Sequence, residues 1–303
     1  MAFLWFGRRP KNVIVVQEKP APRFTVFAGQ RRLANNPYIL PKDLTEVKRL
    51  DFQHFVLKYG IHGNYLAPIS QPTAILDVGC GTGRWAMEMA RDFPGAKVYG
   101  LDVVAAEDFT IGYGLQYKPQ NYTFLEGDAL KPLPFPDNTF DFTHQRLLIG
   151  AVPMGKWPEI IQELKRVTRP GGWIELAECG VPRDEPGKPY PQLWSTWIDF
   201  SKSRNVDFTM GSSIGQLLRN GQLAQVKQHE IIFPMGNYGG HIGLMSATDC
   251  LAMGRTMKNP VITKGIIDEK TYDTLYNATE QEFNMKIGKG VLPFYIAYAQ
   301  KPL

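Results

Sequence analysis

The sequence predicts an α/β fold in which parallel strands alternate with helices in a doubly wound sheet. Apolar runs of strand length alternate with helical patterns, a glycine-rich turn follows the first run at residues 74–76, and acidic residues close the next two runs. Such alternation is typical of parallel sheets covered by helices on both faces. With 303 residues, 44% of them hydrophobic, the chain can fill one large core and still carry a sizeable addition.

The turn after the first strand reads Asp-Val-Gly-Cys-Gly-Thr-Gly-Arg-Trp at residues 77–85 and opens onto a helical pattern. Glycine at positions 79 and 81 lets the main chain approach a ligand closely because no Cβ intervenes, and Gly83 permits tight contact between helix and strand. Backbone N–H groups at such a helix start favour a small anionic or zwitterionic ligand. The turn therefore predicts a nucleotide-like cofactor.

The spacing of the glycines separates the cofactor classes. The dinucleotide fingerprint G-x-G-x-x-G would need a glycine where the chain has Arg84, or, one frame later, where it has Ala86, which the fingerprint tolerates. An NAD-type oxidoreductase is therefore disfavoured and stays an alternative. A Walker loop is excluded because no Gly-Lys-Ser/Thr follows the glycines.

The remaining pattern, D-x-G-x-G-x-G after a strand, resembles motif I of the class I S-adenosylmethionine (SAM) dependent methyltransferases. Asp77 at the strand end can hold an ammonium group, directly or through water, and SAM carries one where NAD does not. The second strand, 97–102, ends in Asp102 about 20 residues past the glycines, where a carboxylate can accept from two adjacent ribose hydroxyls.

Later segments are similar to the same family. Residues 122–130 look like its adenine-contacting segment, in which the acid accepts from the exocyclic amine and the next small residue lies along the ring. The run Pro-Phe-Pro-Asp-Asn-Thr-Phe-Asp before a fourth strand and the Arg-Pro-Gly-Gly stop after a helix at 157–167 also match. The resemblance implies SAM as cofactor, bound by Asp77, Gly79, Cys80, Gly81, Gly83, Asp102, Val103, Asp128, Ala129 and Gln145.

The resemblance also implies a Rossmann-like sheet of seven strands, mostly parallel, with an antiparallel last strand at residues 291–299. A helical cap, with a helix over 43–59, and inserted lid helices are expected around it, as in small-molecule methyltransferases of the ubiquinone-biosynthesis and secondary-metabolism types. The expected parts are a basic and apolar N-terminal arm (1–36), the cap (37–68), a SAM-binding core (69–182), a lid insertion (183–225), and the C-terminal part of the core sheet with additional helices (226–303).

Aromatic side chains are concentrated in the expected lid. Trp194, Trp197 and Phe200 recur every third residue of a short helical pattern, which suggests an apolar wall over the substrate or, alternatively, ordinary core packing. The residues expected to line the substrate are Tyr113, Tyr190, Trp194 and Trp197.

The sequence leaves the catalytic base and the acceptor atom open. His144 at the end of the fourth strand is the candidate base, and strand alternation turns only one of His144 and Gln145 toward the pocket. A buried His144 with no proton to move is the alternative. No Asn/Asp-Pro-Pro-Tyr/Phe, no Pro-Cys pair and no metal constellation are present, which favours a small apolar or aromatic acceptor over nucleic acid. Further candidates for catalysis are Tyr65, Tyr113, Tyr190 and Glu178.

The amino-acid composition limits the cellular compartments and the partners to be expected. Cys80, Cys179 and Cys250 lack metal or disulfide spacing, and no apolar run reaches the length of a membrane span, so a cytoplasmic protein is expected. Much of the net charge of +5 lies in the N-terminal arm, which is expected to be a solvated tail; contact with a membrane surface or with a neighbouring subunit of an oligomer is the alternative. A SAM-binding regulatory protein without turnover is the main alternative to an enzyme.

Overall fold

The computed structural model describes residues 24–27, 30–33, 44–103 and 118–303. Most of the expected N-terminal arm, the start of the expected cap helix at Asp43 and the candidate Tyr113 lie outside these residues. Within the arm, β1 (Phe24–Phe27) and β2 (Gln30–Leu33) pair antiparallel. In the described part of the chain, no helix is both long and apolar enough to cross a bilayer.

A seven-stranded sheet forms the centre of the molecule, in the order β5-β4-β3-β6-β7-β9-β8. β9 runs antiparallel to β7 and to β8, and all other pairs in this sheet are parallel, so the predicted mostly parallel sheet with an antiparallel last strand is confirmed. The central strand β3 is buried over its last four residues because helices cover both faces of the sheet. The strands are β3 (Ala74–Val78), β4 (Lys97–Asp102), β5 (Tyr122–Glu126), β6 (Phe140–Arg146), β7 (Thr168–Cys179), β8 (Ala224–Pro234) and β9 (Val291–Gln300).

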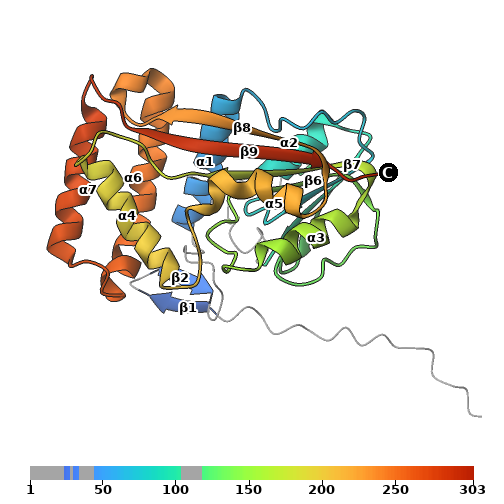
Figure 1. The fold of residues 1–303 in the computed structure, drawn as a ribbon, viewed down its shortest axis with the longest axis horizontal. Helices are drawn as coiled ribbons and strands as arrows, with labels where there is room; N and C mark the ends of the chain where they lie inside the picture. Colours follow the sequence, from blue (N-terminus) through green and yellow to red (C-terminus); the bar gives the residue numbers. More distant parts are fainter. Residues whose placement is uncertain (1–23, 28–29, 34–43, 104–117) are drawn as a thin grey trace, which may run out of the picture.

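Helices cover both faces of this sheet. Figure 1 shows α3 (Trp157–Val167) and α5 (Ile214–Asn220) in front of the sheet, with α1 (Leu44–Ile61) and α2 (Arg84–Asp92) behind it. The apolar stripe of α3, with Ile160 and Leu164, packs in one core with the strands. The arrangement is doubly wound, as the alternation of strands and helices predicts.

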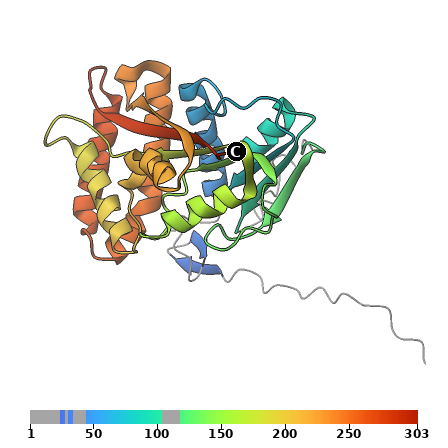
Figure 2. The same ribbon diagram turned by 45° about the vertical axis from the view of Figure 1, so that its right-hand side comes forward.

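A second apolar core lies at one end of the molecule, where α4 (Pro189–Lys202), α6 (Gly240–Thr263) and α7 (Glu269–Asn284) stand together, away from α2 and α3 (Figures 1 and 2). Trp197 is fully buried there, and its Nε1 donates a hydrogen bond of 3.0 Å to Tyr272 Oη. The aromatic spacing of α4 therefore serves core packing.

The expected lid insertion does not form one unit. Its first helix, α4, belongs to the second core, whereas the 3-10 turn Met210–Ser213 and α5 pack on β7, β8 and β9 of the main sheet. The two parts of this segment separate because Ile214 and Leu218 of α5 are buried in the core of the main sheet. Residues 183–225 thus tie the two cores together.

Candidate cofactor-binding site

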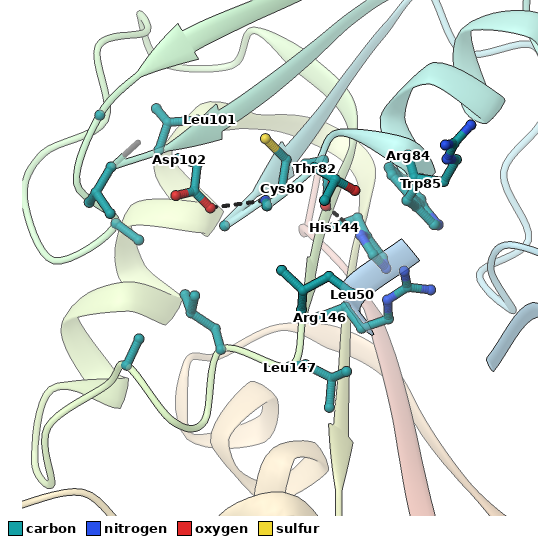
Figure 3. Close-up of a pocket in the computed structure, with 18 of the residues that line it drawn as sticks. Leu50, Cys80, Thr82, Arg84, Trp85, Leu101, Asp102, His144, Arg146 and Leu147 are labelled. Atoms are coloured by element: carbon teal, nitrogen blue, oxygen red, sulfur yellow. Dashed lines mark hydrogen bonds and ion pairs between the residues drawn. The ribbon is translucent and has the colours of Figure 1, made fainter. Parts of the chain in front are cut away.

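A pocket opens at the carboxyl ends of β3, β4 and β6, between the glycine turn and α1 (Figure 3). Ligands of doubly wound sheets bind at this edge, where neighbouring crossovers lie on opposite faces. Every lining residue comes from one of five short segments of the chain. They lie within 50–54 of α1, 77–85 around the glycine turn, 101–103 at the end of β4, 127–130 after β5, and 144–151 at and after the end of β6.

Internal hydrogen bonds hold the glycine turn in place. The backbone N–H groups of Gly79 and Cys80 both donate to the carbonyl of Leu101, at 2.8 and 3.1 Å, and that of Gly81 donates to Asp102 Oδ2 at 2.9 Å. Gly79 has a φ of 72°, and a Cβ there would lie 2.6 Å from Leu148 Cδ1. These N–H groups are thus satisfied within the protein, which corrects the expectation that they face a ligand.

The acids that close β4 and β5 reach the pocket as expected. Asp102 supports the glycine turn through Oδ2 and lines the pocket together with Val103. Asp128 accepts a hydrogen bond of 2.9 Å from the backbone N–H of Leu130, a turn that fixes its carboxylate in the wall beside Ala129. The structure therefore brings together in one wall the residues expected near the ribose and the adenine.

Asp77 and His144 form a buried pair at the inner end of the pocket. They are register partners on β3 and β6, and Asp77 Oδ1 lies 2.8 Å from His144 Nδ1. The imidazole is only 1% exposed and stacks on the Trp85 indole, with 3.8 Å between ring centroids. Burial lowers the pKa of His144, against the raising influence of Asp77. Burial favours the neutral imidazole, and in that form Nδ1 can donate to the Asp77 carboxylate.

Three other candidates lie away from the pocket. Gln145 points to the opposite face of β6 from His144, as strand alternation requires, and its buried amide has no partner among the described residues. Tyr65 packs against Phe142 at 5.8 Å between ring centroids and does not line the pocket. Gly83 is the N-cap of α2, and its Cα faces the hydroxyl of Tyr122, whereas its neighbours Thr82 and Arg84 line the pocket.

The prediction that aromatic residues of the expected lid line the substrate is also corrected by the structure. Tyr190, Trp194 and Trp197 lie in the second core and are absent from the pocket wall. Each is almost fully buried among α4, α6 and α7, because aromatic residues three and four apart on a helix share one face. Glu178 is buried at the end of β7 and is likewise no part of the wall.

Sequence reasoning missed the wall that α1 and the end of β6 supply. Leu50, Gln53 and His54 face the pocket from α1, and Arg146 faces it from β6. The spacing of the α1 residues, i, i+3 and i+4, is that of one helical face and could have indicated a shared surface. Nothing in the sequence pattern distinguishes Arg146 from a solvated strand end.

Comparison with known proteins decides the family. A family model described as a methyltransferase domain matches residues 75–172. The N-methyltransferase sirN of Leptosphaeria maculans is 30% identical to the chain over 224 residues, which cover 71% of the chain and 76% of sirN. The chain belongs to the class I SAM-dependent methyltransferases. The predicted family is thereby confirmed.

Two further relatives match this methyltransferase over a smaller share. Methyltransferase str3 of Strobilurus tenacellus is 32% identical over 142 residues, 46% of the chain and 48% of str3. Secondary metabolism regulator LAE1 of Cochliobolus heterostrophus is 33% identical over 173 residues, 53% of either protein. The chain thus spans about half the length of these two relatives.

The family match explains which parts of the pocket the sequence revealed. The matched residues 75–172 of this methyltransferase contain the glycine turn, the strand-end acids and β6. The α1 wall lies outside the matched residues, so its contribution became visible only in the folded chain. Within the described ranges, no group of three or more His, Cys, Asp or Glu side chains is arranged to hold a metal ion.

Proposed function

We propose that the chain transfers a methyl group from SAM to a small, apolar or aromatic metabolite. One observation carries the proposal: Asp77, Asp102 and Asp128, each at or just after a strand end, line a single pocket together with the glycine turn. This set supplies acceptors for the ammonium, the ribose hydroxyls and the adenine amine of SAM. Gly79 lets the turn pack closely against Leu148, a residue of the pocket wall, because a Cβ at this position would lie 2.6 Å from Leu148 Cδ1.

The residues of the chain would act mainly by alignment and by exclusion of water. Bound SAM supplies an electrophilic methyl group on its sulfonium, so the protein must place an acceptor in line with that group. Asp77, oriented by the neutral His144, fixes one end of the pocket, and Asp102 and Asp128 fix the other. His144 can take a proton only through its Nε2, because its Nδ1 is committed to Asp77.

Apolar side chains in the pocket wall favour an apolar acceptor. Leu50, Leu147 and Leu148 line the pocket there. The relative sirN is named an N-methyltransferase, which makes nitrogen the first acceptor atom to test. The three cysteines are free, which supports a reducing compartment such as the cytoplasm.

Calorimetry with SAM, S-adenosylhomocysteine and NADH tests the cofactor. We expect both adenosyl ligands to bind and NADH to give no heat. Asp102→Asn keeps an acceptor for the Gly81 N–H and removes the ribose carboxylate, so affinity for S-adenosylhomocysteine should fall about tenfold or more. Asp137→Asn, at an exposed surface carboxylate paired with Arg166, is the control and should bind normally. Binding of NADH in preference to both adenosyl ligands would overturn the proposal.

A SAM-binding regulator without turnover is the second candidate, because the relative LAE1 is named a secondary metabolism regulator. Mass spectrometry of lipophilic phenols, indoles and prenylated amines incubated with SAM and the protein separates the two functions. A methylated product supports the enzyme. Tight SAM binding with no methylated product from any of these compounds, nor from a metabolite extract, supports the regulator.

A further inference from the structure

Gln53 of α1 carries a side-chain amide in the pocket wall, together with Leu50 and His54. Its Nε2 donates a hydrogen bond of 2.9 Å to Asp249 Oδ2 of α6. Because an ionised carboxylate only accepts hydrogen bonds, this contact decides which end of the amide faces α6. The carbonyl oxygen Oε1 is left at the other end, and no group in the described part of the chain donates to it.

Asp249 is held in place by a buried arginine. Its Oδ1 accepts a hydrogen bond of 3.0 Å from Arg49 Nη1. The same guanidinium donates through Nε and Nη2 to the two carboxylate oxygens of Glu46, at 2.8 and 2.7 Å. Forked contacts between a guanidinium and a carboxylate have a well-defined geometry. The Gln53 amide therefore has one orientation, which α1 and α6 set together.

Another side of α1 is bonded to the glycine turn. Asp51 Oδ1 accepts from Thr82 Oγ1 at 2.7 Å, and Asp51 Oδ2 accepts from Arg84 Nη2 at 2.9 Å. Helix α1 is thus fixed both to the turn that begins α2 and to α6. A shift of Gln53 would break contacts on one of these two sides.

The other polar groups of the wall are engaged. His54 faces Arg146 Nη2 through its Nδ1, at 3.0 Å, and Glu88 Oε1 through its Nε2, at 3.2 Å. The three acids at the strand ends bind the cofactor in the proposed function. Oε1 of Gln53 is therefore the oxygen that α1 offers to a second molecule in the pocket, the one that accepts the methyl group.

A neutral oxygen at this place suits an amine that has to stay uncharged. The amine attacks the methyl carbon with its lone pair, the bond from carbon to sulfur breaks, and the electron pair of that bond stays on sulfur. Positive charge develops on nitrogen, so its N–H donates more strongly to a carbonyl oxygen in the transition state. A carboxylate would instead favour the protonated ammonium, which has no lone pair to attack with. The proton leaves to water after the transfer.

We propose that Gln53 selects a neutral amine as the methyl acceptor, with Oε1 receiving the N–H of that amine. Asp249 is a positioning residue, which keeps this oxygen toward the pocket. The inference rests on the proposed function, since it takes the pocket to bind SAM. It names the class of the acceptor as a primary or secondary amine with an apolar body, which Leu50 and the other leucines of the wall can contact.

SAM with a deuterated methyl group tests the acceptor class. The protein receives this SAM with a mixture of prenylated amines, indoles and phenols, and separately with a metabolite extract. Mass spectrometry detects the labelled products, and fragmentation shows which atom carries the label. We expect the label on nitrogen, in compounds that had an N–H before the reaction.

Gln53→Leu tests the residue with the amine that this experiment identifies. Its kcat/KM should fall about tenfold or more, because the amine loses its acceptor. Affinity for S-adenosylhomocysteine, measured by calorimetry, should not change, which also shows that the variant is folded. Gln216→Leu, at an exposed glutamine of α5 that donates to Asn220, is the matched control and should keep the wild-type kcat/KM.

Asp249→Asn tests the positioning. The new side chain keeps one oxygen, which Arg49 takes, so its nitrogen faces Gln53, and the Gln53 amide turns over to present N–H to the pocket. We expect kcat/KM to fall about as far as in Gln53→Leu. The double variant should be no worse than either single variant, because both changes remove the same hydrogen bond. A structural role alone would make the two losses multiply.

Three results would overturn the inference and leave the proposed function standing. They are label on oxygen or carbon only, an unchanged kcat/KM in Gln53→Leu, and a loss of S-adenosylhomocysteine affinity in that folded variant, which would assign Gln53 to the cofactor. If Gln53→Leu does not fold, Gln53→Met is measured in its place, and the position of the label decides in either case. A wild type that binds S-adenosylhomocysteine and yields no labelled product contradicts methyl transfer itself.

Discussion

At the scale of single residues, the buried carboxyl of Glu178 has the clearest measurable consequence. Its Oε1 accepts from the backbone N–H of Leu148 at 2.9 Å, which holds the loop after β6 against β7. Burial raises the pKa of Glu178 to about 8, against the lowering influence of the N–H groups of Leu148 and Ile149. The folded protein therefore keeps a proton that the unfolded chain releases.

The free energy of unfolding should depend on pH through this group. Between the ordinary value of 4.5 and about 8, the folded state binds one more proton than the unfolded state. Stability is therefore lost as pH rises through this window, by about 1.4 kcal/mol per pH unit. Glu178→Gln keeps the acceptor for Leu148 and removes the charge, so urea unfolding at pH 5 to 8 should show a shallower slope. Glu159→Gln, an exposed carboxylate on α3, should keep the wild-type slope.

The sequence was sufficient to predict those site residues that stand at the end of a single strand. Asp77, Asp102 and Asp128 were predictable because each follows an apolar run and strand ends meet at one edge of a parallel sheet. Arg146 and His54 were not, because their meeting depends on how α1 lies across the sheet. That packing is a tertiary property, which local periodicity does not encode.

At the scale of elements, the start of α2 depends on a glycine in a tight place. Gly83 has a φ of 73°, and a Cβ there would lie 2.5 Å from the hydroxyl of the buried Tyr122. Gly83→Ala therefore combines backbone strain with a steric clash, and we expect unfolding free energy to fall by about 2 to 4 kcal/mol. Gly155→Ala, with a φ of 86° and open space around it, should cost only about 1 kcal/mol in the same denaturant titration.

The second core makes a different prediction for α4. Trp197 fills the space between α4, α6 and α7, and Tyr272, to which it donates, passes a hydrogen bond of 2.7 Å on to the carbonyl of Gly254. Trp197→Ala should lower the free energy of unfolding by about 3 to 5 kcal/mol. Affinity for S-adenosylhomocysteine should not change, as titration calorimetry can show. A selective loss of ligand affinity with unchanged stability would restore the lid interpretation.

Element boundaries were predictable where one face is strongly apolar. The helix expected at 157–167 is α3 to the residue, and the last strand differs from β9 by one residue. Strand β8 shows no strongly apolar face, because it is an edge strand whose residues are mostly exposed and polar. Polar side chains on an edge strand hinder its pairing with other chains. They also remove the alternation of apolar and polar residues by which a strand is recognised in the sequence.

At the scale of the whole molecule, ligand binding should stabilise the fold by mass action. A ligand that binds only the folded state adds about 2.7 kcal/mol at a free concentration 100 times its Kd. S-adenosylhomocysteine at that excess should therefore raise the urea midpoint of unfolding. NADH at the same concentration should leave the midpoint unchanged, and a larger shift with NADH would contradict the assignment of the pocket.

The fold class and strand direction were predictable at this scale, and the division into parts was not. Seven strands with one antiparallel member follow from the family resemblance and are present. The first helix of the expected lid, α4, belongs to the second core, because it packs on α6 and α7, and sequence alone does not show this packing. Along the chain, α5 and β8 separate α4 from α6 and α7, and only long-range packing brings α4 to them.

The place of β9 between β7 and β8 has a consequence for biosynthesis. A ribosome releases β8 before α6, α7 and β9, yet within the sheet β8 pairs only with β9. Until residues 291–300 emerge from the exit tunnel, the edge of β7 that pairs with β9 has no partner strand, and β8 has no partner strand either. Unpaired strand edges can pair with strands of other chains and cause aggregation. Translational pausing within α6 or α7 should therefore prolong the interval in which the nascent chain needs a chaperone.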